Sequence, residues 1–543
     1  CDPNTKAQCV LPYNPTSYDD LNQRFNWQIP TRFNVGVACS DLPAAVAPDK
    51  PAIIDYSGQS PVSISFSKLA ERSTRFAGAM SALGIGPGDR VAVMLPQCHQ
   101  AVVAHLGIYK LGAIVVPLAM QFGPEAMMHR LSAAGVKAFI GDTSGLERLD
   151  EIRQNLPELE ILISVDDTKS PVIAFDNLIK AAGSGFMPAQ TAPDDPAMML
   201  FTSGTTGQPK GALHGHRVLL GHLPGIQMAQ GFMPQHGDLF WTPSDWSWAG
   251  GLLNALLPAL YFGVTVVAAR APKFDPDWAI GLIKKAGIRN VFMPATAIKM
   301  MQTSLASRPD LGLRTLGTAG EALGGQTLSW AHETLGLQIN EFYGQTECNA
   351  IISACHEIGI HKPGSMGKSV PGHKVAILGS ESEHLPTGEI GEIAIQKPSP
   401  VMFLEYWNDP ASTAEKFNGN WMLTGDRGWC DSEGYFHFVG RNDDVITSAG
   451  YRIGPSEIED CLTSHPAVEL AAVVGKPDPV RTEIVCANIK LAVGYQRSDL
   501  LETEIRNHVK NRLSAHEYPR EINFVGNIPL TESGKVIRRH FRH

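Results

Sequence analysis

Residues 197–211 read Ala-Met-Met-Leu-Phe-Thr-Ser-Gly-Thr-Thr-Gly-Gln-Pro-Lys-Gly, an apolar run that passes directly into a loop of glycines and hydroxyl side chains. The apolar run Ala197–Phe201 predicts a buried strand. In the loop, Gly204 and Gly207 permit close backbone approach, while hydroxyls and backbone N–H groups can surround phosphate oxygens. Lys210 adds a mobile positive charge. A plain surface loop is the alternative, and the Walker A pattern is not satisfied, but the preceding strand favours a phosphate loop.

Helical and strand patterns alternate before this loop. Leu69, Phe76 and Met80 fall on one helical face, the glycines and proline of residues 84–88 end that helix, and residues 90–95 form a strand pattern. Repeated units of this kind predict α/β layers with a substantially parallel sheet.

Length and composition limit the class of protein. A chain of 543 residues is too long for one compact core, so we expect at least two domains. A net charge of -9 argues against a general nucleic-acid partner. Dispersed cysteines without a CxxC pair and a start without a signal-peptide pattern predict a cytoplasmic protein. Pro258 and Gly263 interrupt the apolar segment 252–269, which we interpret as a buried helix, turn and strand, not a membrane span.

The last hundred residues follow a different pattern. Strand-like runs and helical spacing alternate over short distances, in the segments 468–474, 487–493, 501–513 and 521–525. Ser456 and Glu459 fit a capping box at the start of another helix. We therefore predict a small α+β domain over residues 443–543, after a large domain of layered sheets and helices over residues 1–442.

Four further motifs follow the loop in order. They are Asn340-Glu-Phe-Tyr-Gly-Gln-Thr-Glu347, Trp421-Met-Leu-Thr-Gly-Asp-Arg-Gly428, Gly440-Arg-Asn-Asp-Asp-Val-Ile-Thr-Ser-Ala-Gly-Tyr-Arg-Ile-Gly454 and Ser533-Gly-Lys535. Together with residues 202–211, they resemble the signatures of the adenylate-forming superfamily, which includes acyl-CoA synthetases, luciferases and peptide-synthetase adenylation domains. Because the motifs occur in the same order over most of the chain, a chance resemblance is negligible.

The resemblance implies the α/β fold of these enzymes, with a large N-terminal domain, a small mobile C-terminal domain and a hinge at Asp443. It also implies the site that binds ATP. The residues that correspond to that site are Thr202, Ser203, Gly204, Thr205, Thr206, Gly207, Lys210, Gly320, Glu321, Ala322, Glu341, Phe342, Tyr343, Gly344, Gln345, Thr346, Asp426, Arg441, Arg452 and Lys535.

The roles implied by the resemblance suit the residue types. Adenylation joins a carboxylate to a triphosphate, so the site must neutralise charge at the α-phosphorus. Glu347 suits Mg²⁺, which prefers oxygen ligands, and is assigned as the metal ligand. Asp426 can accept hydrogen bonds from both ribose hydroxyls. Lys535 is assigned to bridge the carboxylate and the α-phosphate, and Thr346, Glu347 and Arg452 complete the catalytic set.

Within the superfamily the closest resemblance is to the medium-chain acyl-CoA synthetases. The segment Trp241–Trp248 resembles their tryptophan-containing segment, so Trp241, Trp246, Trp248 and Gly344 are assigned to the acyl pocket. Acetyl-CoA synthetases carry tryptophan where this chain has Gly344, and we expect a deeper pocket for a medium-chain, branched or aromatic acid. The residues expected to bind CoA are Ala449, Gly450, Tyr451, Arg481 and Tyr518.

The sequence therefore predicts an acid:CoA ligase that uses ATP, Mg²⁺ and coenzyme A. An acyl-AMP ligase that loads a carrier-protein thiol is one alternative, and a family member that binds nucleotide without catalysis is another. The presence of Glu347, Asp426 and Lys535 argues against the second alternative. A structural zinc site at His214, His216 and His222 is not favoured, because their spacing matches no zinc motif. The particular acid and the oligomeric state remain open.

Overall fold

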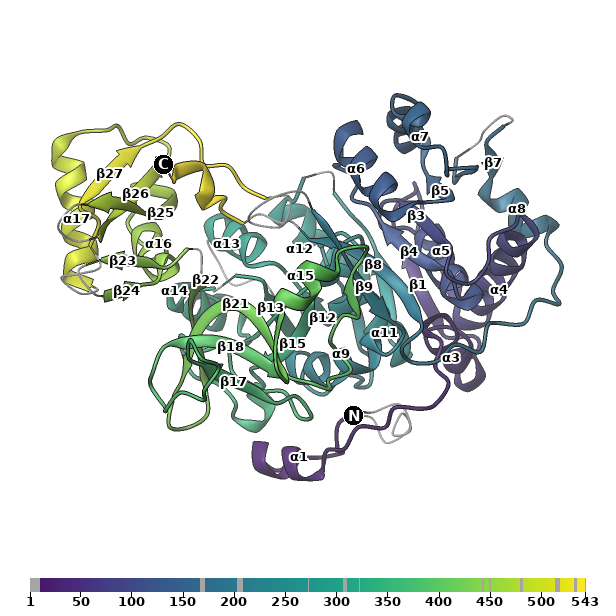
Figure 1. Cartoon of the computed structure of the whole chain (residues 1–543), viewed down its shortest axis with the longest axis horizontal. Helices are drawn as coiled ribbons and strands as arrows, with labels where there is room; N and C mark the ends of the chain where they lie inside the picture. The colour runs from purple at the N-terminus through teal and green to yellow at the C-terminus, as the bar shows by residue number, and fades with distance from the viewer. Residues whose placement is uncertain are drawn as a thin grey trace.

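The computed structural model describes residues 10–166, 171–202, 209–271, 273–305, 310–321, 323–441, 444–448, 451–478, 482–512, 518–531 and 535–542. These residues form a large body and a smaller C-terminal lobe, which is yellow in Figure 1. The prediction of an α/β protein with a large N-terminal domain of layered sheets is confirmed.

The first large sheet contains the strand that leads into the phosphate loop. Its order is β19-β9-β8-β4-β3-β5-β6-β7. The strands are β3 (Arg90–Met94), β4 (Ile114–Pro117), β5 (Ala138–Gly141), β6 (Ile161–Ser164), β7 (Ile173–Ala174), β8 (Pro196–Thr202), β9 (Lys210–Gly215) and β19 (Glu405–Tyr406). The run from β8 through β4, β3, β5 and β6 to β7 is parallel, whereas β8 and β9 form an antiparallel pair. The predicted phosphate loop therefore connects two paired strands.

The second large sheet carries the Tyr343 motif. Its order is β16-β15-β14-β13-β12-β10-β11-β1-β2. The strands are β1 (Pro51–Asp55), β2 (Val62–Ser65), β10 (Leu239–Trp241), β11 (Thr265–Ala268), β12 (Asn290–Phe292), β13 (Thr315–Ala319), β14 (Ile339–Gln345), β15 (Cys348–Ser353) and β16 (Lys368–Ser369). Strands β1 and β10–β14 run parallel.

Helices fill the space between the two sheets and cover their outer faces (Figure 1). They are α1 (Tyr18–Arg24), α2 (Val35–Ala38), α3 (Asp41–Val46), α4 (Phe66–Ala82), α5 (His99–Leu111), α6 (Pro124–Ala134), α7 (Thr143–Asp150), α8 (Phe175–Ala181), α9 (Val218–Ala229), α10 (Ala249–Gly251), α11 (Leu257–Tyr261), α12 (Pro276–Ala286), α13 (Ala295–Ser304) and α14 (Gly325–Trp330). Every residue of α9 is buried, since one hydrophobic core joins this helix to strands of both sheets.

The apolar segment 252–269 has the predicted structure. It forms the π-helical turn Leu252–Leu256, then α11, and then β11, and every residue of these elements except Tyr261 is buried. Within the part of the chain that the structure describes, the helices are too short or too polar to span a bilayer.

A third, antiparallel sheet links the body to the smaller lobe. Its strands are β17 (Val375–Leu378), β18 (Gly391–Gln396), β20 (Phe417–Asn418), β21 (Trp421–Cys430) and β22 (Phe436–Arg441), and the helix α15 (Pro410–Glu415) precedes β20. Asp426 of β21 lies opposite Arg441 of β22 in the register. The predicted domain boundary and hinge, at Asn442 and Asp443, lie outside the described residues.

The smaller lobe has its own sheet and its own hydrophobic core. Its elements are β23 (Ile446–Ser448), β24 (Tyr451–Ile453), α16 (Pro455–Thr463), β25 (Val468–Asp478), β26 (Thr482–Leu491), α17 (Asp499–Arg512), β27 (Glu521–Phe524) and the 3-10 turn η6 (Arg538–Phe541). The predicted capping box is wrong, because Gly454 is the N-cap residue and Pro455 occupies the first helical turn. Glu459 turns instead toward the backbone N–H of Val473 and toward Arg538.

Candidate active site

Lys535 comes from the smaller lobe and reaches the large body. Its Cε and Nζ atoms lie 3.5 and 3.7 Å from the position that a Cβ atom at Gly320 would take, just after β13. Two hydrogen bonds fix its backbone, from Thr531 N to Lys535 O at 2.7 Å and from Lys535 N to Thr531 Oγ1 at 2.9 Å. The structure thus brings together two predicted ATP-binding residues that are far apart in the sequence.

Asp426 is held by two other predicted ATP-binding residues. The hydroxyl of Tyr343 donates to its Oδ2 at 2.6 Å, and Nη1 of Arg441 lies 3.8 Å from its Oδ1. Burial raises the pKa of Asp426, and the positive charge of Arg441 opposes that rise. A carboxylate fixed in this way is a rigid acceptor, which is the property that recognition of two neighbouring hydroxyl groups requires.

Glu347 and Lys210 are linked through Tyr406, a residue that the sequence did not single out. The hydroxyl of Tyr406 donates to Oε1 of Glu347. Nζ of Lys210 lies 5.5 Å from the centre of the Tyr406 ring, donates to Ser412 Oγ and lies 3.5 Å from Asp409 Oδ2. One aromatic side chain therefore sets the spacing between the predicted metal ligand and the lysine at the end of the phosphate loop.

The residues around Glu347 fit the Mg²⁺ ion that the resemblance implies. Glu347 is buried, lies in the turn between β14 and β15, and offers a carboxylate close to the end of the phosphate loop. Mg²⁺ in nucleotide enzymes is commonly bound by one or two carboxylates together with phosphate oxygens and water. A single protein carboxylate is therefore sufficient when the triphosphate supplies the other ligands.

Four further predicted ATP-binding residues lie at the end of β8 and in or just after β14. Thr202 ends β8, and Thr346 shares the turn with Glu347. Gln345 accepts from Lys416 Nζ at 3.0 Å through its side-chain oxygen. Phe342 is buried and packs in the central core, so its side chain supports the site from behind.

Glu321 and Glu341 lie at the junction between the two lobes. Leu323 N donates to Oε1 of Glu341 at 3.0 Å, and burial raises the pKa of Glu341 to about 7. Burial also raises the pKa of Glu321. Across the junction, Lys299 of α13 lies 3.4 Å from Asp460 of α16. The sequence gave no indication of this pair, since neither residue belongs to a recognised motif.

The structure does not bring the three predicted acyl-pocket tryptophans together. Trp241 is fully buried in the core beside α12, and its indole N–H donates to Ala269 O at 3.1 Å. Trp246 is buried in the core between the sheets, whereas Trp248 is half-buried against Phe122, with ring centres 5.9 Å apart. Trp241 therefore has a packing role, and Trp246 and Trp248 occupy separate environments.

Gly344 has a steric reason to be glycine that differs from the predicted one. A Cβ atom there would lie 2.5 Å from the backbone N of Ala350 and 2.5 Å from Cα of Asn349. Real Cβ atoms do not approach backbone so closely, so any side chain requires β15 to move. The expectation that a tryptophan at this position would simply fill an open pocket does not follow from this geometry.

Several predicted residues lie outside the part of the chain that the structure describes. Among the ATP-binding and hinge residues these are Ser203, Gly204, Thr205, Thr206, Gly207, Ala322 and Asp443, and among the CoA-binding residues Ala449, Gly450 and Arg481. Tyr451 and Arg452 are described only by their backbone, in β24, where Arg452 pairs with Thr447.

Comparison with known proteins agrees with this arrangement. The model of the AMP-binding enzyme family matches residues 41–407, and that of the AMP-binding enzyme C-terminal domain matches residues 457–535. The chain belongs to the AMP-binding enzymes. It is similar to an uncharacterized acyl-CoA ligase of Bacillus subtilis, with 35% identity over 88% of this chain and 90% of that protein. It is equally similar to the human mitochondrial acyl-coenzyme A synthetase ACSM2B, with 35% identity over 88% of this chain and 84% of that one.

A solved structure has the same fold. It is that of the anthranilate CoA ligase AuaEII in complex with anthranoyl-AMP, with a TM-score of 0.86 and 26% identity over 94% of this chain and 97% of that one. The relatives and this structure show that the chain is an AMP-forming acyl-CoA synthetase, which uses ATP and CoA.

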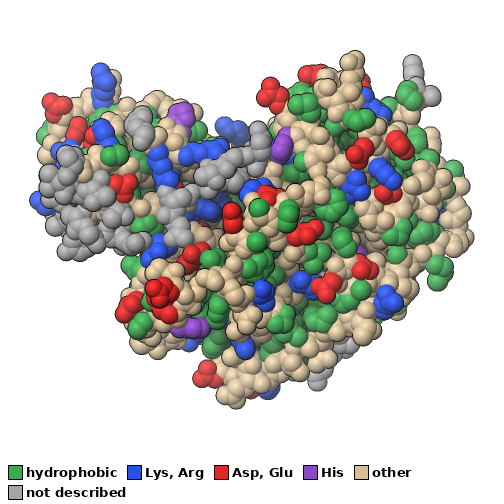
Figure 2. Space-filling model, viewed as in Figure 1, with side chains coloured by type: hydrophobic (Ala, Val, Ile, Leu, Met, Phe, Trp, Pro, Cys, Tyr) green, Lys and Arg blue, Asp and Glu red, His purple; other side chains and the backbone are tan. Residues whose placement is uncertain are grey.

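For such a synthetase, Tyr518 is the predicted CoA residue whose side chain the structure describes. Its ring centre lies 5.6 Å from Lys510 Nζ and 5.1 Å from Arg520 Cζ. Figure 2 shows further Lys and Arg side chains gathered on the side of the smaller lobe that faces the large body. Positive charge there favours the phosphates of CoA and ATP.

The clustered histidines of this AMP-binding enzyme belong to its core. Burial lowers the pKa of His214 to about 3 and the pKa values of His216 and His222 to about 4, so these imidazoles are neutral. Among the described residues, no three or more His, Cys, Asp or Glu side chains are placed to hold a metal ion together.

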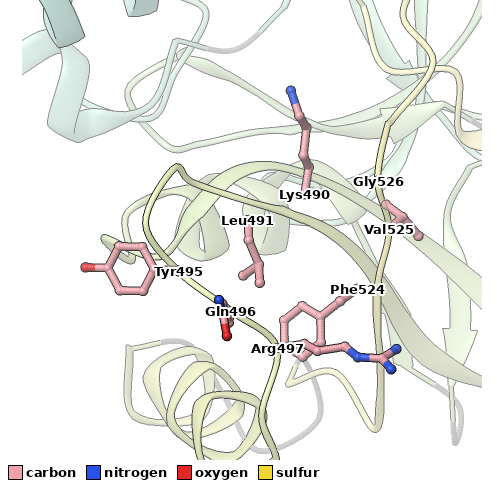
Figure 3. Close-up of a pocket in the computed structure, with 8 residues that line it drawn as sticks. All are labelled: Lys490, Leu491, Tyr495, Gln496, Arg497, Phe524, Val525 and Gly526. Atoms are coloured by element: carbon pink, nitrogen blue, oxygen red, sulfur yellow. The ribbon is translucent and has the colours of Figure 1, made fainter.

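A hollow of about 580 Å³ lies on the smaller lobe, between the ends of β26 and β27 (Figure 3). It is lined by Lys490, Leu491, Tyr495, Gln496, Arg497, Phe524, Val525 and Gly526. None of these is a predicted site residue, so the hollow is separate from the arrangement around Lys535.

Proposed function

We propose that this synthetase activates a carboxylic acid larger than acetate, of the medium-chain, branched or aromatic class, and transfers the acyl group to CoA in two steps. The observation that carries the proposal is the position of Lys535. This residue of the smaller lobe lies beside Gly320 in the large body, where the resemblance expects the adenine of ATP. This position of Lys535 supports a role in the first step, adenylation.

In the first step, we propose that Lys535 stabilises the negative charge that develops when the carboxylate attacks the α-phosphorus. Asp426 holds the ribose hydroxyls, and Lys210 contacts the phosphates. Glu347 holds Mg²⁺, which, when bound, neutralises charge on the triphosphate and on the leaving pyrophosphate. The C–O–P anhydride of the acyl-adenylate forms as the bond between the α- and β-phosphates breaks.

In the second step, the thiol of CoA attacks the acyl carbon, and AMP leaves. We propose that the smaller lobe turns about Asp443 for this step, so that Ala449, Gly450 and Tyr451 approach the adenylate and Lys535 withdraws. Tyr518 and Arg481 then lie near the nucleotide end of CoA. The cations around Tyr518 support this assignment, since they surround its ring with positive charge.

The size of the acid is supported by a structural neighbour. The solved structure with the same fold is named as a ligase for anthranilate, an aromatic acid. The buried indole of Trp246 has an N–H without a partner among the described residues. A polar substituent on the acid would satisfy that donor.

A panel of carboxylic acids tests the proposal. Acetate, straight-chain acids of increasing length, branched acids and aromatic acids are each incubated with ATP, Mg²⁺ and CoA, and AMP formation is measured. We expect acetate to be a poor substrate and at least one larger acid to give AMP only when CoA is present. Efficient turnover of acetate alone would overturn the assignment of acid size.

The same panel separates the alternatives for the acceptor and for catalysis. A carrier-protein ligase would show acid-dependent exchange of pyrophosphate into ATP, but CoA would not drive AMP formation. A nucleotide-binding protein without catalysis would bind ATP and show no exchange with any acid. Removing Mg²⁺ with a chelator should abolish the acid-dependent exchange of pyrophosphate into ATP.

A further inference from the structure

The chain that carries Lys535 is anchored three residues later by an arginine that is mostly buried. Arg538 Nε donates to Glu459 Oε1 at 2.7 Å, its Nη2 contacts Glu459 Oε2, and its Nη1 lies 3.0 Å from Asp444 Oδ2. The side chains of Arg538, Glu459 and Asp444 are 17%, 12% and 13% exposed. Arg542 of the same tail also contacts Asp444.

The two partners of Arg538 lie in different parts of the smaller lobe, one in its core and one beside the predicted hinge. Glu459 belongs to α16 and also accepts from Val473 N at 2.8 Å, so it is fixed to the central sheet of the smaller lobe. Asp444 follows directly after Asp443, the predicted hinge. One guanidinium therefore ties the tail both to the rigid part of its lobe and to the first described residue beyond the hinge.

The tail around Lys535 needs such an anchor. Figure 1 shows it leaving the smaller lobe toward the large body and returning to end beside β25. The Lys535 side chain is exposed, and the hydrogen bonds of its backbone are made to Thr531, which belongs to the same tail. A bidentate arginine–carboxylate pair is geometrically specific, so it fixes the orientation of the tail as well as its position.

We propose that Arg538 is a positioning residue for adenylation: by joining the tail to Glu459 and Asp444, it makes Lys535 move as one body with the segment that follows the hinge. The inference rests on the proposed roles of Lys535 and Asp443. It predicts that the pairs of Arg538 matter for the step in which Lys535 acts and much less for the step from which Lys535 withdraws.

The main experiment measures two half-reactions in Arg538→Gln and Arg538→Lys. One is acid-dependent exchange of pyrophosphate into ATP, and the other is thioester formation from chemically synthesised acyl-adenylate and CoA. Because a catalytic group displaced by about 1 Å can cost about 10²-fold in rate, we expect Arg538→Gln to lower exchange about 10²-fold. Thioester formation should fall less than about threefold, and Arg538→Lys should recover part of the exchange, since it restores the charge without the planar fork.

The matched control is Lys490→Gln. Lys490 forms an ion pair with Glu469 at 2.5 Å on the surface of the same lobe, away from the tail, and lines the hollow in Figure 3. Its loss should leave both half-reactions unchanged. Equal losses of both half-reactions in Arg538→Gln would show that the arginine only stabilises the lobe, and would overturn the proposal.

A double variant gives a sharper criterion. If Arg538 acts through Lys535, then Lys535→Ala combined with Arg538→Gln should show the same exchange rate as Lys535→Ala alone. Multiplying losses would mean that the two residues act independently, which contradicts a positioning role.

Hydrogen–deuterium exchange tests the anchoring without any activity. The amides of Lys535 and Ile537, which donate to Thr531 Oγ1 and Pro529 O, should exchange at least about tenfold faster in Arg538→Gln than in the unmodified protein and in Lys490→Gln. Unchanged protection would overturn the anchoring role. An unmodified protein that shows no exchange of pyrophosphate with any acid would instead overturn the proposed function, while the amide protection still decides the anchoring.

Discussion

Replacing Lys535 with alanine is the most direct test of the two-step mechanism. The Nζ atom lies 3.7 Å from the Cβ position of Gly320, and we take it to approach the α-phosphate to about 4 Å when ATP is bound. Two unit charges about 4 Å apart interact by about 4 kcal/mol at an effective dielectric constant of about 20. Since Lys535 is exposed before substrate binds, we reduce this to about 3 kcal/mol, the usual scale for losing one such stabilising group.

A loss of about 3 kcal/mol corresponds to a rate decrease of roughly 10²-fold. We therefore expect Lys535→Ala to lower acid-dependent exchange of pyrophosphate into ATP by two or more orders of magnitude. The same variant should convert synthetic acyl-adenylate and CoA to thioester at a near-normal rate. Gly450→Leu should do the reverse, because its side chain would obstruct the proposed thiol path without touching ATP.

The opposite behaviour of these two variants is the decisive feature. Both half-reactions can be followed in the same preparation, by isotope exchange and by loss of free thiol. If each variant impairs both half-reactions to the same extent, one fixed active site performs both steps, and the rotation of the smaller lobe is refuted.

Three further variants or conditions have defined outcomes. Glu347→Gln should weaken adenylation and raise the Mg²⁺ concentration needed for half-maximal exchange, and unchanged metal dependence would exclude Glu347 as a ligand. Gly344→Ala should lower the free energy of unfolding by about 1–3 kcal/mol, since its Cβ would lie 2.5 Å from the backbone N of Ala350, and a melting temperature equal to that of the unmodified protein would contradict this packing. Burial lowers the pKa values of His214, His222 and His373 to about 3, 4 and 4, so the unfolded chain, with pKa values near 6.5, binds more protons between those limits. The free energy of unfolding should therefore fall as pH decreases from 6.5 toward 4, by up to about 4 kcal/mol per pH unit for the three together, and urea midpoints that do not change between pH 7 and pH 5 would show that these imidazoles are not buried in the neutral form.

The sequence predicted the parts of the fold that depend on local pattern. The strand Ala197–Phe201 became β8, and the apolar segment 252–269 became a buried helix and strand, because hydrophobic period and breakers are local properties. The capping box at Ser456 failed for the opposite reason. Glu459 does not cap the helix, because its carboxylate accepts hydrogen bonds from Arg538 and from Val473 N instead. These tertiary contacts cannot be read from a local pattern.

Site residues that belong to a sequence motif were predicted. Site residues that only the fold brings to the site were missed. Asp426 and Tyr343 are both motif residues, and the structure joins them by a hydrogen bond of 2.6 Å. Tyr406 reaches Glu347 only because β19 pairs with β9, a register that no short pattern contains. Trp241 was assigned to the acyl pocket from its position in a motif-like segment, and the pleat of β10 places its side chain in the core beside α12.

The contact between Lys299 and Asp460 has a consequence for the pace of turnover. Its side chains are 39% and 32% exposed, and an ion pair of that kind contributes at most about 1 kcal/mol. A stronger ion pair between the lobes would keep the smaller lobe in the proposed adenylation arrangement after the adenylate has formed. It would therefore delay the attack of the CoA thiol. Under the proposed turning of the smaller lobe, a weak ion pair can break and re-form without holding the lobe in either arrangement.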